Sequence, residues 1–192
     1  MHMERTAPVW LLLAYSLPKE PSRYRVSVWR RLRKLGAIYL SEGFWVLPNL
    51  DSLKPDLESV IKEVQSSGGT ASAFVSSDFD PEQAGRLEAR FLDARNEEYS
   101  ELQGQQAKFL LHVEHAHSTR RYTFAEVEEL EEELAKLEHW LAEIRERDVF
   151  RSPEYEKTAL SLGEARKLLE SFTEVTYAEV GEKPPSDLAP GH

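Results

Sequence analysis

Positively charged side chains are concentrated in one short segment near the N-terminus, where they could bind a polyanion. At about 100° per residue, a helix over residues 22–36 would place Val28 and Leu32 on an apolar face, with cations on the remaining sides. Arginine and lysine are the residues that contact DNA phosphates, and arginine also reads guanine edges. The candidate DNA-binding residues are therefore Arg23, Arg30, Arg31, Arg33 and Lys34.

The charge of this segment contrasts with that of the whole chain, which has a net charge of -10. Residues 1–50 hold eight Lys or Arg against three Asp or Glu, whereas residues 51–192 hold sixteen against thirty-one. Such asymmetry is typical of a surface that meets polyanions. The alternative is a solvated helix face that balances the acidic remainder of the chain or docks against it.

Three histidines are the next residues whose spacing could support chemistry. His112 and His115 are three residues apart on a predicted helix, and imidazoles at that spacing can share a metal ion. His117 does not fall on the same helix face. The alternative is that these side chains favour the negative end of the helix dipole. We expect no bound metal or other cofactor, with His112 and His115 as the weak candidates.

The sequence lacks the patterns that would indicate an enzyme. It contains no glycine-rich phosphate loop, no Gly-x-Ser-x-Gly and no His-Glu-x-x-His. The absence of cysteine excludes disulfides and thiolate metal sites and is consistent with a reducing cytoplasm. The apolar run over residues 9–15 is too short to span a membrane. We therefore expect a cytoplasmic protein that is not an enzyme and has no membrane partner.

The elements that must position the basic residues alternate between strands and helices. Apolar runs predict strands over 8–17, 37–40, 44–47 and 70–76, and apolar spacing predicts a helix over 53–64. Ser22 is a suitable N-cap for the basic helix, and Gly36 is suited to its end. The order β-α-β-β-α-β predicts a ferredoxin-like α+β sandwich over residues 8–78, with both helices on one sheet face.

The second half of the chain is predicted to be a helical unit over residues 80–180. Asp80 and Pro81 begin a helix that extends to about residue 117, and Thr123 with Glu126 forms a capping box for the next. That helix carries an apolar seam with a 3.5-residue period, and a third helix follows over about 153–177. The result is a long-helix hairpin plus a third helix. Its seam could support self-association, so a homodimer is expected, and residues 181–192 should form a disordered tail.

Several segments taken together resemble a known family. They are Trp10-Leu-Leu-Leu-Ala-Tyr-Ser-Leu-Pro18, Trp29-Arg-Arg-Leu-Arg-Lys-Leu-Gly-Ala37, Gly43-Phe-Trp-Val-Leu-Pro48 and the acidic helix from Tyr122 to its Ile-Arg-x-Arg-Asp ending at Asp148. Over roughly residues 8–180 the chain is similar to the N-terminal domain of the chromate-resistance regulator ChrB family. The resemblance implies a chromate-responsive transcriptional regulator of a chromate-resistance operon, with DNA as partner and chromate as effector.

A chromate effector would need a site for a tetrahedral dianion, which arginine or backbone N–H donors can provide. The candidates in the helical half are Arg90, Arg95, Arg145 and Arg147. The alternative for each of these residues is an ordinary salt bridge between helices.

Two other functions remain open. One is a protein-interaction or oxyanion-binding module that touches no nucleic acid. The other is metal-dependent nuclease activity, because the first eighty residues are similar in outline to the small CRISPR-associated nuclease. That nuclease has an Asp at the end of its first strand, whereas this chain has Tyr15-Ser16-Leu17-Pro18 there. Without a carboxylate to hold a metal, this reading is disfavoured.

Overall fold

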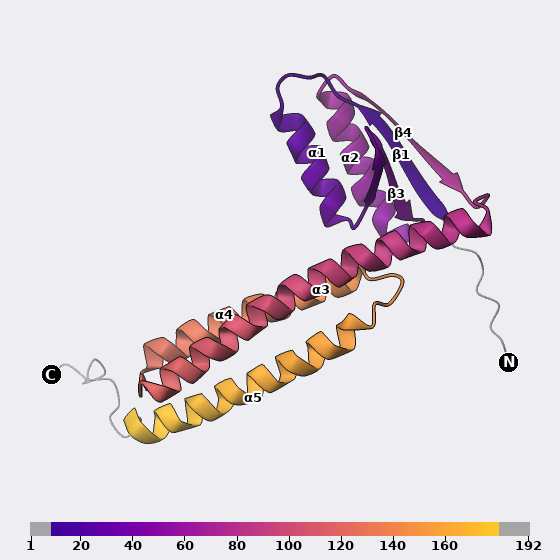
Figure 1. The fold of residues 1–192 in the computed structure, drawn as a ribbon. Coiled ribbons are helices and arrows are strands. Elements are labelled where there is room, and N and C mark those ends of the chain that lie inside the picture. The colour runs from indigo at the N-terminus through magenta and orange to yellow at the C-terminus, as the bar shows by residue number, and fades with distance from the viewer. Residues whose placement is uncertain (1–8, 181–192) are drawn as a thin grey trace. The chain divides into compact units, whose positions relative to one another are not determined.

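A computed structural model describes residues 9–180 and gives an α+β protein with a four-stranded antiparallel sheet and five α-helices (Figure 1). The predicted disordered tail, residues 181–192, lies outside the described residues. The elements in chain order are β1 (Trp10–Ser16), α1 (Arg23–Lys34), β2 (Ile38–Ser41), β3 (Phe44–Pro48), the 3-10 turn η1 (Asp51–Leu53), α2 (Lys54–Ser66), β4 (Thr70–Ser76), α3 (Pro81–Ser118), α4 (Phe124–Arg147) and α5 (Glu154–Val180).

The strands follow the order β2-β3-β1-β4, and every neighbouring pair is antiparallel. β1 is an inner strand, with Leu13 opposite Trp45 of β3 on one side and Ala73 of β4 on the other. Trp10, Leu11 and Leu13 are buried, whereas Leu12 and Ala14 are partly exposed, so the apolar run predicted as the first strand is not fully buried on both faces. The β-α-β-β-α-β order of the elements is confirmed.

One face of the sheet is covered by α1 and α2, which lie side by side in Figure 1. Leu13 and Trp45 from the sheet share a core with Val28 and Leu32 of α1 and with Val60 of α2. Each of these side chains is almost completely buried. The two helices therefore pack on the same face, as the sequence predicted.

The first turns of α3 belong with the sheet. The chain divides into two compact units, residues 1–91 and 92–192, and the division falls inside α3. Trp10 of β1 stacks on Phe91 with ring centroids 5.5 Å apart, and it also meets the edge of Phe79. The boundary predicted at residue 80 coincides with the start of α3. The division between the two compact units comes later, because Phe91 of α3 packs on Trp10 of the sheet.

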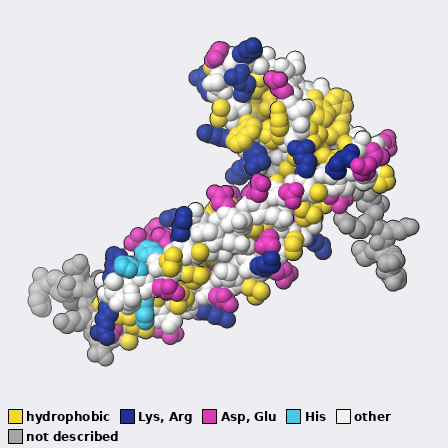
Figure 2. Space-filling view, in the orientation of Figure 1, with side chains coloured by type: hydrophobic (Ala, Val, Ile, Leu, Met, Phe, Trp, Pro, Cys, Tyr) yellow, Lys and Arg dark blue, Asp and Glu magenta, His cyan; other side chains and the backbone are white. Residues whose placement is uncertain are grey.

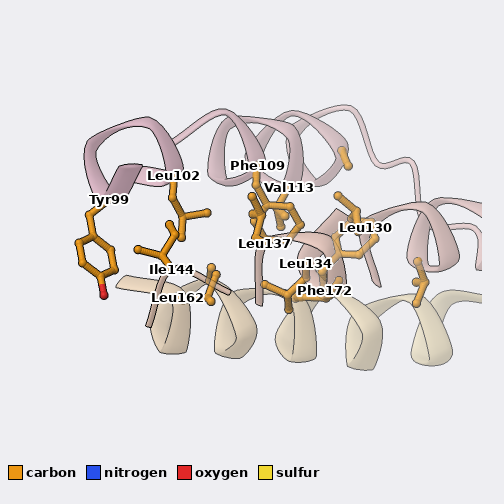
Figure 3. Close-up of a cluster of buried hydrophobic side chains, with 14 residues drawn as sticks. Tyr99, Leu102, Phe109, Val113, Leu130, Leu134, Leu137, Ile144, Leu162 and Phe172 are labelled. Carbon is orange, nitrogen blue, oxygen red and sulfur yellow. The ribbon is translucent and has the colours of Figure 1, made fainter. Parts of the chain in front are cut away.

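The helical unit has its own core, formed by α4, α5 and the later turns of α3 (Figure 3). Leu130, Leu134, Leu137 and Ile144 of α4 are buried against Phe172 and other residues of this unit. The apolar seam of α4 was predicted from its period, and it is buried within this single chain. The seam is therefore not a free surface for a second copy.

Three helix ends test the capping residues predicted from the sequence. The Thr123 side chain accepts a hydrogen bond from the backbone N–H of Glu126 at 3.2 Å, which confirms it as the N-cap of α4. Gly36 has φ 76°, as expected of a glycine that ends a helix. Ser22 occupies the N-cap position of α1, but its backbone is helical and its side chain forms no capping bond. The prediction that Ser22 caps the helix is therefore wrong.

No helix within residues 9–180 combines the length and apolar character that crossing a bilayer requires.

Candidate nucleic-acid interface

Helix α1 presents most of its cations to solvent. Arg23, Arg30, Arg33 and Lys34 are exposed, and the helix is anchored by Val28 and Leu32 on its buried side. Within residues 9–180, none of the chain's own acidic side chains forms an ion pair with Arg30 or Arg33. Figure 2 shows Lys and Arg side chains spread over this part of the sheet unit beside hydrophobic ones. The surface is thus open to a polyanion.

Arg31 is the exception among the five candidates. Its guanidinium donates to Glu63 of α2 at 2.7 Å and to the Ser59 hydroxyl at 2.9 Å. A hydrogen bond from Ser27, together with Arg31, holds the pKa of the Glu63 carboxyl below its ordinary value despite partial burial. Arg31 therefore fastens α1 to α2, which is the docking that the sequence analysis gave as the alternative for the whole basic helix.

Two apolar side chains lie among the exposed cations of α1. Trp29 is 50% exposed and Val26 is 43% exposed. The Arg33 guanidinium lies 5.9 Å from the centre of the Trp29 ring. Trp29 is not among the five residues that the sequence analysis named as DNA-binding candidates. Its position outside the apolar stripe of Val28 and Leu32 was the signal that it would face solvent.

Val26 and Trp29 line a groove of about 810 Å³ between α1 and the β2–β3 hairpin. Arg25, Trp29 and Arg30 form the helix side, and Tyr39, 47% exposed, contributes from β2. Cations that follow a backbone, interleaved with aromatic faces on which bases stack, are typical of nucleic-acid-binding grooves. One acidic residue, Glu42, also lines the groove.

Gly43 shapes the sheet side of the groove. Its φ of +70° lies in the left-handed region, and a Cβ placed there would be 2.1 Å from the backbone oxygen of Tyr15. The close approach allows the Tyr15 N–H to donate to the Gly43 carbonyl at 2.8 Å. A glycine is required here because any larger residue would push the hairpin away from β1.

The four oxyanion candidates do not gather around an open site. Arg95 and Arg147 bind the same carboxylate, Glu98, at 2.9 and 3.0 Å, so an acidic side chain already lies between them. Arg145 lies over the Tyr155 ring and 3.5 Å from Asp148. Arg90 donates to the backbone oxygen of Tyr39 in the sheet unit. For Arg95, Arg145 and Arg147 the contacts match the salt-bridge alternative.

The Asp of the Ile-Arg-x-Arg-Asp ending of α4 forms hydrogen bonds that stabilise the α4–α5 turn. Asp148 accepts from the backbone N–H of Ser152 at 2.9 and 3.0 Å and from the Tyr99 hydroxyl at 3.2 Å. Burial and the adjacent carboxylate raise the pKa of the Tyr99 hydroxyl, so it remains a donor. The Ser152 hydroxyl in turn accepts from the N–H of Glu154 at the start of α5. The motif thus holds the α4–α5 turn against α3.

The three histidines lie in different surroundings. His115 is exposed, and the His117 ring lies 3.0 Å from the Tyr122 hydroxyl. Within residues 9–180, the His and carboxylate ligand atoms that converge on one point belong instead to His112, Glu126 and Glu129. Hydrogen bonding to Glu133, opposed by desolvation and aided by the charge of Glu126, raises the pKa of His112. The sequence analysis did not name these glutamates as ligands, because they are distant from His112 along the chain and Glu126 was assigned to a capping box.

Comparison with known proteins identifies the family of the chain. A family model described as "Protein ChrB, N-terminal" matches residues 25–183, which include most of α1 and all later described elements. The chain is also 36% identical over 92 residues to Protein ChrB of Cupriavidus metallidurans, a match that covers 48% of this chain and 28% of that protein. The matched segment thus spans little more than a quarter of that relative's length. The chain belongs to the ChrB N-terminal family.

Proposed function

We propose that this chain is a DNA-binding regulatory module of chromate resistance that contacts DNA phosphates through α1. The observation that carries the proposal is the exposed row of Arg23, Arg30, Arg33 and Lys34 on a helix of an otherwise acidic chain. Membership of the ChrB N-terminal family supports the link to chromate resistance. Arg25 and Trp29 at the groove add a further cation and a stacking surface.

We infer that the sheet unit has the ferredoxin-like architecture. The antiparallel order β2-β3-β1-β4 and the two helices on one face support this assignment. In this arrangement α1 crosses one face of the sheet with its outer side exposed. Twelve residues give a helix about 18 Å long, which fits a DNA major groove.

The regulatory part of the proposal concerns an effector and a second copy. We propose chromate as effector, a homodimer that presents two copies of α1 to a two-fold operator, and a cytoplasmic location without enzymatic activity. Because the α4 seam is buried within its own chain, the dimer would form through another surface. Chromate should change the DNA affinity, whereas sulfate at the same concentration should not.

The deciding experiment is the salt dependence of binding to DNA from upstream of the chain's own gene. In Arg30→Glu with Lys34→Glu, two exposed cations become acids, so affinity should fall more than tenfold. The slope of log K against log salt should become shallower by about 2, because each phosphate contact contributes about 0.9. Fluorescence anisotropy with labelled duplex gives both quantities.

A matched control separates a local effect from a global charge effect. Lys136→Glu with Lys157→Glu changes the net charge by the same amount at exposed positions of the helical unit. We expect that variant to keep nearly the affinity and slope of the original chain. Equal loss in both double variants, or no loss in the α1 variant, would overturn the assignment of α1. It would favour a module that binds no nucleic acid.

A further inference from the structure

His112 of α3 lies between two carboxylates of α4. Its Nδ1 is 3.1 Å from Glu133 Oε2, and its Nε2 is 3.1 Å from Glu126 Oε1. A neutral imidazole has one donor nitrogen and one acceptor nitrogen, so it can donate to only one of these carboxylates. The other nitrogen would then face an anion with its lone pair. The contact is favourable only when a cation, either a proton or a metal ion, lies at that nitrogen.

A third carboxylate, that of Glu129, lies close to His112 and Glu126. The ligand atoms of His112, Glu126 and Glu129 all lie within 4.8 Å of one another. Glu126 and Glu129 are three residues apart and so lie on one face of α4. We propose that these three side chains bind one first-row divalent cation, through His112 Nε2 and a carboxylate oxygen from each glutamate.

The surroundings of the three ligands fit such a site. A metal-binding histidine usually donates its other ring N–H to a carboxylate, and Glu133 occupies that position at Nδ1. The second carboxylate oxygen also has a partner, because the Arg121 guanidinium forms an ion pair with Glu126 Oε2 at 3.0 Å, which leaves Oε1 for the cation. Both outer partners are already in place around the three ligands.

The charge and burial of the cluster also favour a bound cation. The Glu126 side chain is only 3% exposed, and an ionised carboxylate buried to this degree needs compensating positive charge. Three glutamates and one arginine leave two negative charges, which a divalent ion would neutralise. A mixed set of one imidazole and two carboxylates suits Zn²⁺ and its neighbours better than Mg²⁺ or Ca²⁺, which prefer oxygen ligands alone. Exposed Glu129 leaves the site accessible from solvent.

The test is zinc binding by the full untagged chain after chelator treatment and dialysis. Isothermal titration with ZnCl₂ should show one ion per chain, and elemental analysis should find that ion retained after dialysis. His112→Gln and Glu129→Gln each remove a ligand and should weaken binding by more than about tenfold. Glu133→Gln, which removes the partner of Nδ1, should weaken it by about 10- to 100-fold. Glu129 is exposed, so its variant reports on the site even if a change at buried Glu126 prevents folding.

His115→Gln is the matched control, because His115 is an exposed histidine one turn along the same helix. It should bind zinc as the original chain does, and circular dichroism should show the same helix content in all variants. If His115→Gln weakens binding as much as His112→Gln, zinc is held by surface histidines and the site is wrong. If the original chain takes up no stoichiometric zinc, the cation at Nε2 is a proton, which also overturns the proposal.

Discussion

Arg31 and Glu63 show how neighbouring side chains of one type acquire different roles. Arg30 and Arg33 are exposed on α1, whereas Arg31 binds Glu63 and Ser59 of α2. One position along a helix turns a side chain by about 100°, enough to move it from solvent to the neighbouring helix. Arg31 is therefore expected to contribute to the docking of α1 more than to contact with a polyanion.

The lowered pKa of Glu63 gives a prediction about acid stability. Because its pKa in the folded chain is below the ordinary value of about 4.3, ionised Glu63 stabilises the fold above that pH. This contribution is lost as pH falls through the lowered pKa. Glu63→Gln should therefore reduce the free energy of unfolding at pH 7 by up to about 1 kcal/mol, since the pair is partly exposed. The difference from the original chain should shrink toward pH 3.

Urea unfolding at several pH values measures this difference. Glu58→Gln is the control, because Glu58 is an exposed carboxylate on the same helix. Its variant should track the original chain within about 0.5 kcal/mol at every pH. A pH-independent loss in Glu63→Gln would mean that shape, and not ionisation, accounts for the contribution.

At the scale of elements, the two predicted N-caps provide a direct comparison. Thr123 bonds the N–H of Glu126, whereas Ser22 makes no such bond. Thr123→Ala should lower the free energy of unfolding by about 1 kcal/mol. Ser22→Ala should change it by less than about 0.5 kcal/mol. Chemical denaturation of both variants checks the pair, and equal losses would contradict the structural difference between the two helix starts.

The elements themselves followed from local patterns. Strand β4 begins and ends at the predicted residues, and α3 and α4 begin where Pro81 and Thr123 indicated. These features depend on neighbouring residues, and their signals are present in short windows. The prediction for Ser22 was wrong because a residue type that favours the N-cap does not by itself fix the backbone. The Ser22 backbone is helical, with φ -59° and ψ -22°.

The side-chain clusters could not be predicted in the same way. His112 meets Glu126 and Glu133 across a helix hairpin, 14 and 21 residues away along the chain. Spacing within one helix suggested His115 as its partner, since i and i+3 are the positions that a single helix brings together. Which residues of two helices face each other depends on their relative rotation, and that is set by the whole core.

At the scale of the whole molecule, two separate hydrophobic cores divide the chain within α3. Leu130→Ala should therefore loosen the helical unit without loosening the sheet. Leu130 is fully buried, so the substitution should cost about 2–5 kcal/mol. Hydrogen-exchange mass spectrometry should show faster exchange in α4 and α5, with little change in β1 to β4. A matching increase in the sheet would mean that the two cores unfold as one.

The exposed position of Trp29 has a spectroscopic consequence. Trp10 and Trp45 are fully buried and Trp140 is partly buried, so the indole most open to water is the one on α1. Excitation at the red edge of the tryptophan band should therefore select Trp29, and dissolved quenchers should reach it first. Any molecule that covers α1 should shield that emission, which makes the chain its own unlabelled optical probe of occupancy.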